Sequence, residues 1–396
     1  MKKFNKNILV FVFCMLFVGF GLCSRKLYKE FVNSFQDSII GTSSKFTKIS
    51  KFENKIDKAS SENLLYHSLM MDVNSIKENI MGTVVATTKE VVKTDSGFLI
   101  SPRKKVSDEE LLFATDSILE LKTVSESNGS KFLYCAAPQK ECYVKSPENV
   151  LDETGNNRVL FLNRLKQINV PCFDMFSGAE EKEFSINDFF YTDHHWKPSA
   201  GLKATKAICE ELHNRFNYSF NLDYLMEVNY TTQTYKDQFL GSYGKRVGTY
   251  FIWSGRDDFE IITPKFSTSI TDNISQTEKH NFESVMFDKT MLSDDYYNTI
   301  TYDTYKKPKY HSRIIKNDSY NNGKKVLIIG DSFAQVVVPF FALQNLETHI
   351  CDVRNDQGLL GEKTNLQSYI EEHSPDYVIV LYSNETDLEG DRYNFF

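Results

Sequence analysis

An apolar segment that ends in a Gly-Asp-Ser turn sets the tightest limit on the fold. Residues 325–334 read Lys-Val-Leu-Ile-Ile-Gly-Asp-Ser-Phe-Ala, which is typical of a buried strand running straight into a turn. The residues that follow, 335–346, are predicted to form a helix. A buried strand followed at once by a helix is the repeating unit of a parallel sheet covered on both faces. The sequence therefore predicts an α/β fold with a mostly parallel sheet.

The same alternation of short strands and helices recurs along much of the chain. Ser107 and Glu110 form a capping box at the start of one predicted helix. Pro198 begins another, where its missing N–H costs nothing. The predicted strands are residues 84–87, 97–100, 131–137, 172–176, 325–330 and 377–382. The predicted helices are residues 108–125, 158–168, 198–216 and 335–346.

A stretch rich in Tyr, Thr, Asp and Asn interrupts this pattern at about residues 217–322. Within it, residues 250–253 and 259–263 alternate as strands do. We interpret the stretch as a β-rich insertion in an α/β domain that covers residues 83–396.

The N-terminus carries a targeting signal. Lysines at positions 2, 3 and 6 precede an uncharged run at residues 8–24, and further basic residues close it. This run is near the lower length limit for a membrane span and near the upper limit for a signal-peptide core. Because no clean cleavage site follows, we interpret residues 1–25 as a membrane anchor and the polar residues 26–82 as a stalk. A cleaved signal is the alternative, and either interpretation places the domain outside the cytoplasm.

Charge and cysteine content exclude some classes of protein. The net charge is −7 and no long basic run occurs beyond the N-terminus, so nucleic acid is not an expected partner. Hydrophobic residues make up 41% of the chain, which is ordinary for a globular protein. No C-x-x-C spacing is present. We expect single buried thiols, with a Cys135–Cys142 disulfide as the alternative.

Ser332 is the candidate nucleophile. The predicted strand places it at the carboxyl end of a parallel strand, where open α/β sheets carry their sites. Gly330 permits a tight turn, and the N–H groups after the turn can stabilise an oxyanion. A serine in this position is also a common helix N-cap, which is the alternative interpretation.

The second motif, at residues 191–196, reads Tyr-Thr-Asp-His-His-Trp. A serine nucleophile needs a base with a pKa near 7, and an imidazole such as that of His195 supplies one. Asp193 can accept from the other ring nitrogen and so fix its tautomer. Two alternatives remain: a surface loop with a capping aspartate, or a metal site built on Asp193, His194 and His195.

Taken together and in this order, Asp193-His-His-Trp196 and Gly330-Asp-Ser-Phe333 resemble the DHHW family. They are similar to the alginate O-acetyltransferase-like proteins of the SGNH hydrolase superfamily. The resemblance covers about residues 80–396 and extends to residues 241–248, Gly-Ser-Tyr-Gly-Lys-Arg-Val-Gly. It implies an SGNH-hydrolase-like, three-layer α/β/α fold. In the alginate proteins this motif has the form D-x-H-W, which selects Asp193 and His195 and leaves His194 as the variable position.

The resemblance also implies further residues in the site. The alginate proteins have an Arg and a Tyr downstream of the serine, and Arg354 and Tyr382 are the candidates here. A surface ion pair and a core aromatic are the respective alternatives. The remaining candidates for oxyanion or substrate binding are Asn384, Gly241 and Trp196.

These observations predict an extracytoplasmic serine O-acyltransferase that acts on a cell-surface or exported polysaccharide, with acetyl as the expected acyl group. We expect no cofactor and no metal. The resemblance implies a membrane-bound O-acyltransferase partner that supplies the acyl group. The alternatives are a carbohydrate esterase with the same Ser-His-Asp site, a non-catalytic cell-wall polymer-binding protein and a metal-dependent hydrolase.

Overall fold

The computed structural model describes residues 67–86, 90–176, 184–274, 281–306, 311–320, 322–354, 364–383, 388 and 391–396. Helix α3 (His67–Ile80) begins the described part, and Glu78–Phe396 form one compact unit. The predicted anchor and most of the predicted stalk lie outside the described residues. Within the described residues, no helix combines the length and apolarity that a membrane span requires.

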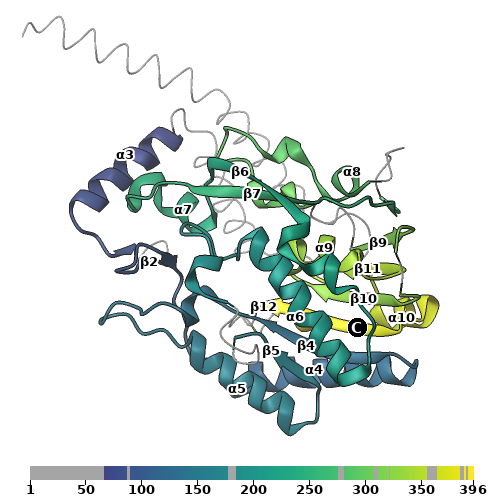
Figure 1. The fold of residues 1–396 in the computed structure, drawn as a ribbon. Coiled ribbons are helices and arrows are strands. Elements are labelled where there is room, and N and C mark those ends of the chain that lie inside the picture. Colours follow the sequence, from purple (N-terminus) through teal and green to yellow (C-terminus); the bar gives the residue numbers. More distant parts are fainter. Residues whose placement is uncertain are drawn as a thin grey trace, which may run out of the picture. The chain divides into compact units, whose positions relative to one another are not determined.

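A seven-stranded, mostly parallel sheet forms the centre of this unit, as the sequence predicts (Figure 1). Its order is β5 (Cys172–Asp174), β4 (Lys131–Ala137), β12 (Tyr377–Ser383), β10 (Lys325–Gly330), β11 (Glu347–Cys351), β9 (Ser312–Asn317) and β8 (Ile270–Asp272). The first five strands are parallel, and the last two pair antiparallel. From β4 the chain continues to β5 on one side of the sheet, and from β10 it continues to β11 on the opposite side, so the two connections diverge. The site is therefore expected at the carboxyl ends of these strands.

Helices cover both faces of the sheet and give three layers. On one face, Leu327 and Ile329 of β10 pack with α4 (Asp108–Ser127), α5 (Thr154–Gln167) and α10 (Leu366–His373). On the other face, Val326 and Ile328 pack with α6 (Pro198–Phe216), α9 (Val338–Ala342) and part of the predicted insertion. Consecutive side chains of a strand point to opposite faces, so both faces of β10 are apolar and buried.

The strongest local signals in the sequence are confirmed. The capping box of Ser107 and Glu110 starts α4, and Pro198 starts α6. The predicted disulfide alternative is not formed, because the thiols of Cys135 and Cys142 are both free.

Two predicted elements are wrong. In place of a helix over residues 335–346, a 3₁₀ turn η9 (Ser332–Val336) is followed by the short α9. Pro339 explains the break, because inside a longer helix its ring nitrogen could not donate a hydrogen bond. Residues 250–253 form no strand. They overlap the 3₁₀ turn η6 (Thr249–Phe251), and Phe251 and Ile252 are buried in a small apolar cluster.

The predicted insertion contributes to several parts of the unit. It contains the antiparallel pair β6 (Tyr230–Phe239) and β7 (Asp257–Pro264) and adds β8 and β9 to the central sheet. It also carries α7 (Ser242–Val247) and the 3₁₀ turn η8 (Thr301–Thr304).

A separate small sheet consists of β1 (Val85–Ala86), β2 (Val91–Lys93) and β3 (Leu99–Ile100). Further described elements are α8 (Phe282–Met286), η2 (Lys140–Cys142), η3 (Ile186–Asp188), η4 (Leu222–Leu225), η5 (Glu227–Asn229), η7 (Lys289–Met291) and η10 (Asp391–Tyr393).

Candidate active site

The Asp-His-His-Trp motif lies on a loop that is closed at its base. Phe189 and Trp196 form an isolated antiparallel bridge, and the N–H of Phe190 donates to the carbonyl of His195 at 3.3 Å. The indole of Trp196 is fully buried, and its Nε1 donates to the carbonyl of Phe333 at 3.1 Å. Trp196 therefore ties this loop (residues 190–196, the histidine loop) to the segment that carries Ser332.

Ser332 is the first residue of η9, directly after β10. The side chain of Asp331 caps this turn: Oδ1 accepts from the N–H of Phe333 at 2.9 Å, and Oδ2 accepts from the N–H and hydroxyl of Ser383, both at 3.0 Å. A Cβ atom at Gly330 would lie 2.4 Å from a side-chain atom of the same turn. Asp331, rather than Ser332, is thus the N-cap, so the hydroxyl of Ser332 is not needed for capping.

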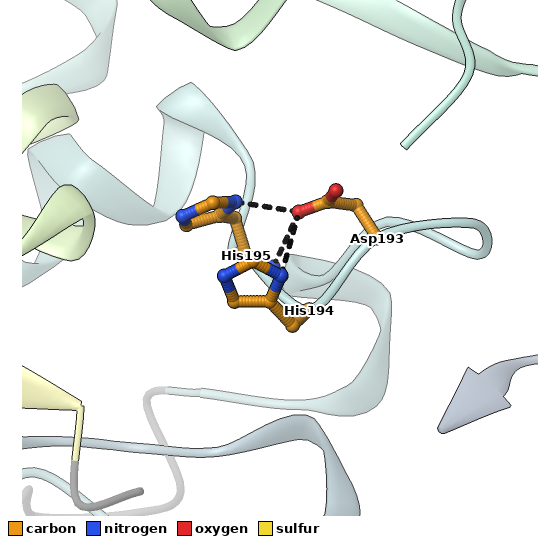
Figure 2. A group of neighbouring side chains, drawn as sticks. All are labelled: Asp193, His194 and His195. Atoms are coloured by element: carbon orange, nitrogen blue, oxygen red, sulfur yellow. Dashed lines mark hydrogen bonds and ion pairs between the residues drawn. The ribbon is translucent and has the colours of Figure 1, made fainter. Parts of the chain in front are cut away.

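The structure brings Ser332, His195 and Asp193 together in one hydrogen-bonded row. Nε2 of His195 lies 2.6 Å from Oγ of Ser332, and Nδ1 lies 2.5 Å from Oδ1 of Asp193. Figure 2 shows one carboxylate oxygen of Asp193 facing a ring nitrogen of His194 and one of His195. Because an ionised carboxylate can only accept, Nδ1 of His195 carries the proton and Nε2 is left to accept from the serine hydroxyl.

The surroundings of Asp193 favour its ionised form. Burial opposes the charge, but the adjacent His194 and His195 and hydrogen bonds from His195 and Ser242 hold the pKa of Asp193 well below its ordinary value. The N–H of Ser242 donates to Oδ2 at 2.5 Å, so each carboxylate oxygen has its own donors. The carboxylate is therefore fixed in place as the acceptor for His195.

A buried lysine holds the carbonyl groups of the histidine loop. Nζ of Lys140, on η2, donates to the carbonyl of Phe190 at 3.1 Å and to that of Asp193 at 2.5 Å. The ammonium also lies over the rings of Phe98 and Tyr243, at 5.8 and 5.1 Å from their centroids. Burial lowers the pKa of Lys140 to about 8, against the opposing effect of nearby carboxylates.

A buried aspartate holds the amide groups of the same loop. Asp257, at the start of β7, accepts from the N–H groups of Tyr191 and Thr192 at 2.7 and 2.8 Å and from the Thr192 hydroxyl at 2.6 Å. Burial raises the pKa of Asp257, although these hydrogen bonds counter the shift. Lys140 thus donates to backbone carbonyls of this loop, and Asp257 accepts from its backbone N–H groups. Together they leave His195 little freedom to move.

Gly241 allows the predicted insertion to approach this loop closely. A Cβ atom at Gly241 would lie 2.2 Å from Cβ of Asp193. The N–H of Gly241 donates to Oγ1 of Thr192 at 2.8 Å, so it is already engaged and does not point to an open oxyanion position. The close approach is what brings the N–H of Ser242 to Asp193.

Arg354 and Tyr382 make their hydrogen bonds outside the Ser332–His195–Asp193 row, although the charge of Asp331, the neighbour of Ser332, reaches both. Arg354 follows β11 as expected, and its guanidinium is held by Asp352 through contacts of 2.9 and 2.7 Å. Tyr382 lies at the end of β12 but is buried in the core, where its hydroxyl donates to the carbonyl of Arg392 at 2.9 Å. Asn384 lies outside the described residues.

Asp193, His194 and His195 also form a group whose ligand atoms lie within 4.8 Å of one another. Both ring nitrogens of His195 are, however, committed to hydrogen bonds with Asp193 and Ser332. A metal ion bound to His195 would have to replace one of these partners. The geometry suits transfer of a proton from Ser332 better than it suits metal binding.

Sequence reasoning missed Lys140, Ser242, Asp257 and Tyr302, the last of which stacks on the imidazole of His195. Ser242 has a visible signal, because it lies in the 241–248 stretch that resembles the family. The other three have no local pattern. Their partners are distant in sequence, and only the folded chain brings them to the histidine loop.

Comparison with known proteins supports the fold assignment. No family model matches the chain, and no curated protein matches it by sequence. Among solved structures, Bacillus cereus PatB1 aligns with a TM-score of 0.62 at 20% identity, covering 77% of this chain and 99% of that chain. PatB1 with a sulfonyl adduct aligns with a TM-score of 0.60 at 21% identity and the same coverage. A DHHW family protein from Eubacterium siraeum aligns with a TM-score of 0.58 at 19% identity, covering 79% of this chain and 96% of that chain.

This chain shares their fold. The predicted resemblance to DHHW proteins is therefore confirmed at the level of fold, and the sheet with helices on both faces agrees with it. At these identities the comparisons bear on the architecture alone.

Proposed function

We propose that the protein is a serine O-acyltransferase that transfers an acyl group, most simply acetyl, to a hydroxyl of an exported polysaccharide. The observation that carries the proposal is the continuous row Ser332–His195–Asp193, with contacts of 2.6 and 2.5 Å. A serine hydroxyl becomes an effective nucleophile when a positioned imidazole takes its proton. The row supports these roles for the imidazole of His195 and the carboxylate of Asp193.

In the first half of the reaction, Oγ of Ser332 attacks the carbonyl carbon of the acyl donor while its proton moves to Nε2 of His195. Asp193 stays ionised and stabilises the imidazolium that forms. Collapse of the tetrahedral intermediate breaks the bond to the donor's leaving oxygen, which takes the proton from His195. The acyl group is then an ester of Ser332.

The N–H of Ser332 is the candidate donor to the oxyanion. The next two amides of the turn are occupied, because Phe333 donates to the Asp331 side chain and Ala334 to the Asp331 carbonyl. Among the described residues, no acceptor is present for the N–H of Ser332 itself. An amide preset in this way can stabilise the developing negative charge without reorganisation.

In the second half, a sugar hydroxyl attacks the acyl carbonyl and gives its proton to His195, and Ser332 is released with its hydroxyl restored. Attack by water in place of the sugar would make the protein an esterase. Transfer to a polysaccharide rests on the resemblance of the two motifs to the alginate O-acetyltransferase-like proteins. The membrane-bound acyltransferase that would supply the donor, and the location outside the cytoplasm, belong to the same proposal.

Mass spectrometry of the protein after exposure to nitrophenyl acetate tests the acyl-enzyme. We expect an acetyl adduct on Ser332, and a sulfonyl fluoride should label the same residue. Ser332→Ala should abolish turnover and both adducts. His195→Ala should cost nearly as much, because members of such a unit fail together. Asp193→Asn should lower turnover by about 10³–10⁴-fold, because the amide favours the wrong imidazole tautomer.

His194→Ala is the matched control. Nδ1 of His194 lies 3.0 Å from Oγ of Ser242, whereas the ring nitrogen that faces Ser332 belongs to His195, so the loss of His194 should be milder. Adding oligosaccharides of different composition distinguishes the two outcomes of deacylation. Acetylated sugar supports transfer, whereas free acetate at an unchanged rate identifies an esterase. Full turnover by the Ser332→Ala protein would refute the mechanism.

A further inference from the structure

Tyr302 covers one face of the imidazole of His195. The two ring centroids are 4.1 Å apart, and the ring planes differ by 15°, so the rings are stacked. Tyr302 belongs to η8, in the predicted insertion, and no sequence motif marks it. The stack leaves the edge of the imidazole, with both nitrogens, directed to Asp193 and Ser332.

The segment that carries the nucleophile also holds Tyr302 in place. Nε2 of Gln335, on the same turn as Ser332, donates to the carbonyl of Tyr305 at 2.7 Å and to Oδ1 of Asp303 at 2.9 Å. It also approaches the carbonyl of Tyr302 at 3.5 Å. The turns η8 and η9 are therefore joined, and the distance between the Tyr302 ring and the Ser332–His195 pair is fixed by direct contacts.

The ring of Tyr302, rather than its hydroxyl, is what the site uses. The hydroxyl is buried and, among the described residues, lacks a well-formed hydrogen bond, because the nearby indole N–H of Trp196 donates to the carbonyl of Phe333 at 3.1 Å. Burial, together with the carboxylates of Asp193 and Asp331, raises the pKa of Tyr302 well above its ordinary value, so the phenol stays neutral. A buried hydroxyl without a well-formed hydrogen bond is a cost to folding. Removing it should leave the stack intact.

We infer that Tyr302 is a positioning residue whose ring orients the imidazole of His195 and stabilises it when it becomes an imidazolium. The face of an aromatic ring carries a partial negative charge and attracts a cation that lies over it. In the proposed mechanism His195 gains a positive charge when it takes the proton of Ser332, so the attraction is larger in the transition state than with the neutral imidazole. The inference rests on the proposed function, in which His195 is the base.

Other charged or titratable groups bear on the same imidazole, and the test must keep them unchanged. They are Asp193 and His194 on its own loop and Ser332 on η9. Lys140 on η2, which donates to the carbonyl of Asp193, and Lys245 on α7 also interact electrostatically with the Asp193 carboxylate. A change confined to Tyr302 leaves all of these groups in the protein.

The test compares Tyr302→Phe with Tyr302→Leu in the full chain. The first variant keeps the ring and the second removes it. We expect Tyr302→Phe to stay within about twofold of wild type and Tyr302→Leu to lower kcat by about tenfold with little change in KM. The pKa of His195, followed by NMR through its ring Cε1–H signal, should fall in Tyr302→Leu only. The acid limb of the pH–activity profile should move to lower pH with it.

The direction of the pKa change separates this role from simple loosening of the core. Water that entered the space left by Tyr302→Leu would solvate the imidazolium and raise the pKa of His195. An unchanged or raised pKa in Tyr302→Leu, or an equal loss of kcat in Tyr302→Phe, would overturn the inference. The NMR titration does not need turnover. If the wild-type protein proves inactive on esters, the proposed function fails, while the effect of the ring on His195 is still measured.

Discussion

Because Gly241 has no side chain, α7 can approach Asp193 closely. A Cβ atom there would lie 2.2 Å from Cβ of Asp193 and 2.6 Å from the carbonyl oxygen of Thr192, so one of the two segments would have to move. We expect Gly241→Ala to lower the free energy of unfolding by on the order of 1–3 kcal/mol. Ester turnover should fall by at least about tenfold, because the donor from Ser242 to Asp193 is displaced.

Gly155→Ala is the control for the same chemical change elsewhere. Gly155 lies in α5, and a Cβ atom there would meet nothing within 4 Å. This substitution should leave turnover unchanged and stabilise the protein by about 0.5–1 kcal/mol, since alanine favours the helix. Chemical denaturation and ester turnover of the two variants check both statements. Equal behaviour of the two variants would show that the close approach at Gly241 has no consequence.

Residues with local sequence signals are the ones that sequence alone can predict. Ser332 follows an apolar strand, and Asp193 and His195 belong to a compact motif, so their types and their order along the chain are enough to suggest a common site. Tyr302 and Lys140 cannot be predicted in this way. Each is an ordinary buried residue until the fold places it beside His195 or its loop.

At the scale of elements, the loop over residues 190–196 depends on Lys140 for its orientation. Lys140→Met removes the donor to the carbonyls of Phe190 and Asp193 and leaves both acceptors buried. We expect ester turnover to fall by about 10–100-fold, because a shift of the loop misplaces His195. Lys236→Met, on an exposed part of β6, makes the same chemical change without touching the loop and should retain wild-type turnover.

The pH dependence of stability gives a second readout for Lys140. Burial lowers the pKa of Lys140 to about 8 in the folded chain, whereas the unfolded chain has the ordinary lysine value of about 10.4. Between these values unfolding takes up a proton, so the free energy of unfolding rises with pH. Relative to Lys140→Met, wild type should gain on the order of 2 kcal/mol between about pH 7 and about pH 10. If the free energies of unfolding of wild type and Lys140→Met change in parallel with pH, the lowered pKa of Lys140 is contradicted.

Elements with strong end signals are predicted well, and those without them are not. The capping box defines the start of α4, and Pro198 that of α6. The region after Ser332 is mostly apolar, so it offers little helical periodicity, and Pro339 limits its regular structure to η9 and the short helix α9. Residues 250–253 have strand-like composition, but burial of Phe251 and Ile252 in a compact cluster outweighs that preference.

At the scale of the whole molecule, the predicted insertion is part of the site. It separates Asp193 and His195 from Ser332 along the chain, yet it supplies Ser242 to the carboxylate and Tyr302 to the imidazole. It also adds β8 and β9 to the edge of the central sheet. An α/β body can be predicted from its strands and helices, but the role of the insertion depends on contacts between residues far apart in sequence.

The whole chain is also expected to be held at a membrane with its α/β domain outside the cytoplasm. The reason is the uncharged run at residues 8–24 with basic residues on both sides, which is long enough to insert into a bilayer. We expect the protein to remain in the membrane fraction after an alkaline wash and its domain to be accessible to protease added to cells stripped of outer layers. A Ser332→Ala protein should fractionate identically, since the run and not the site determines location. A soluble, secreted form whose first residue lies near Arg25 would show that the segment is a cleaved signal peptide.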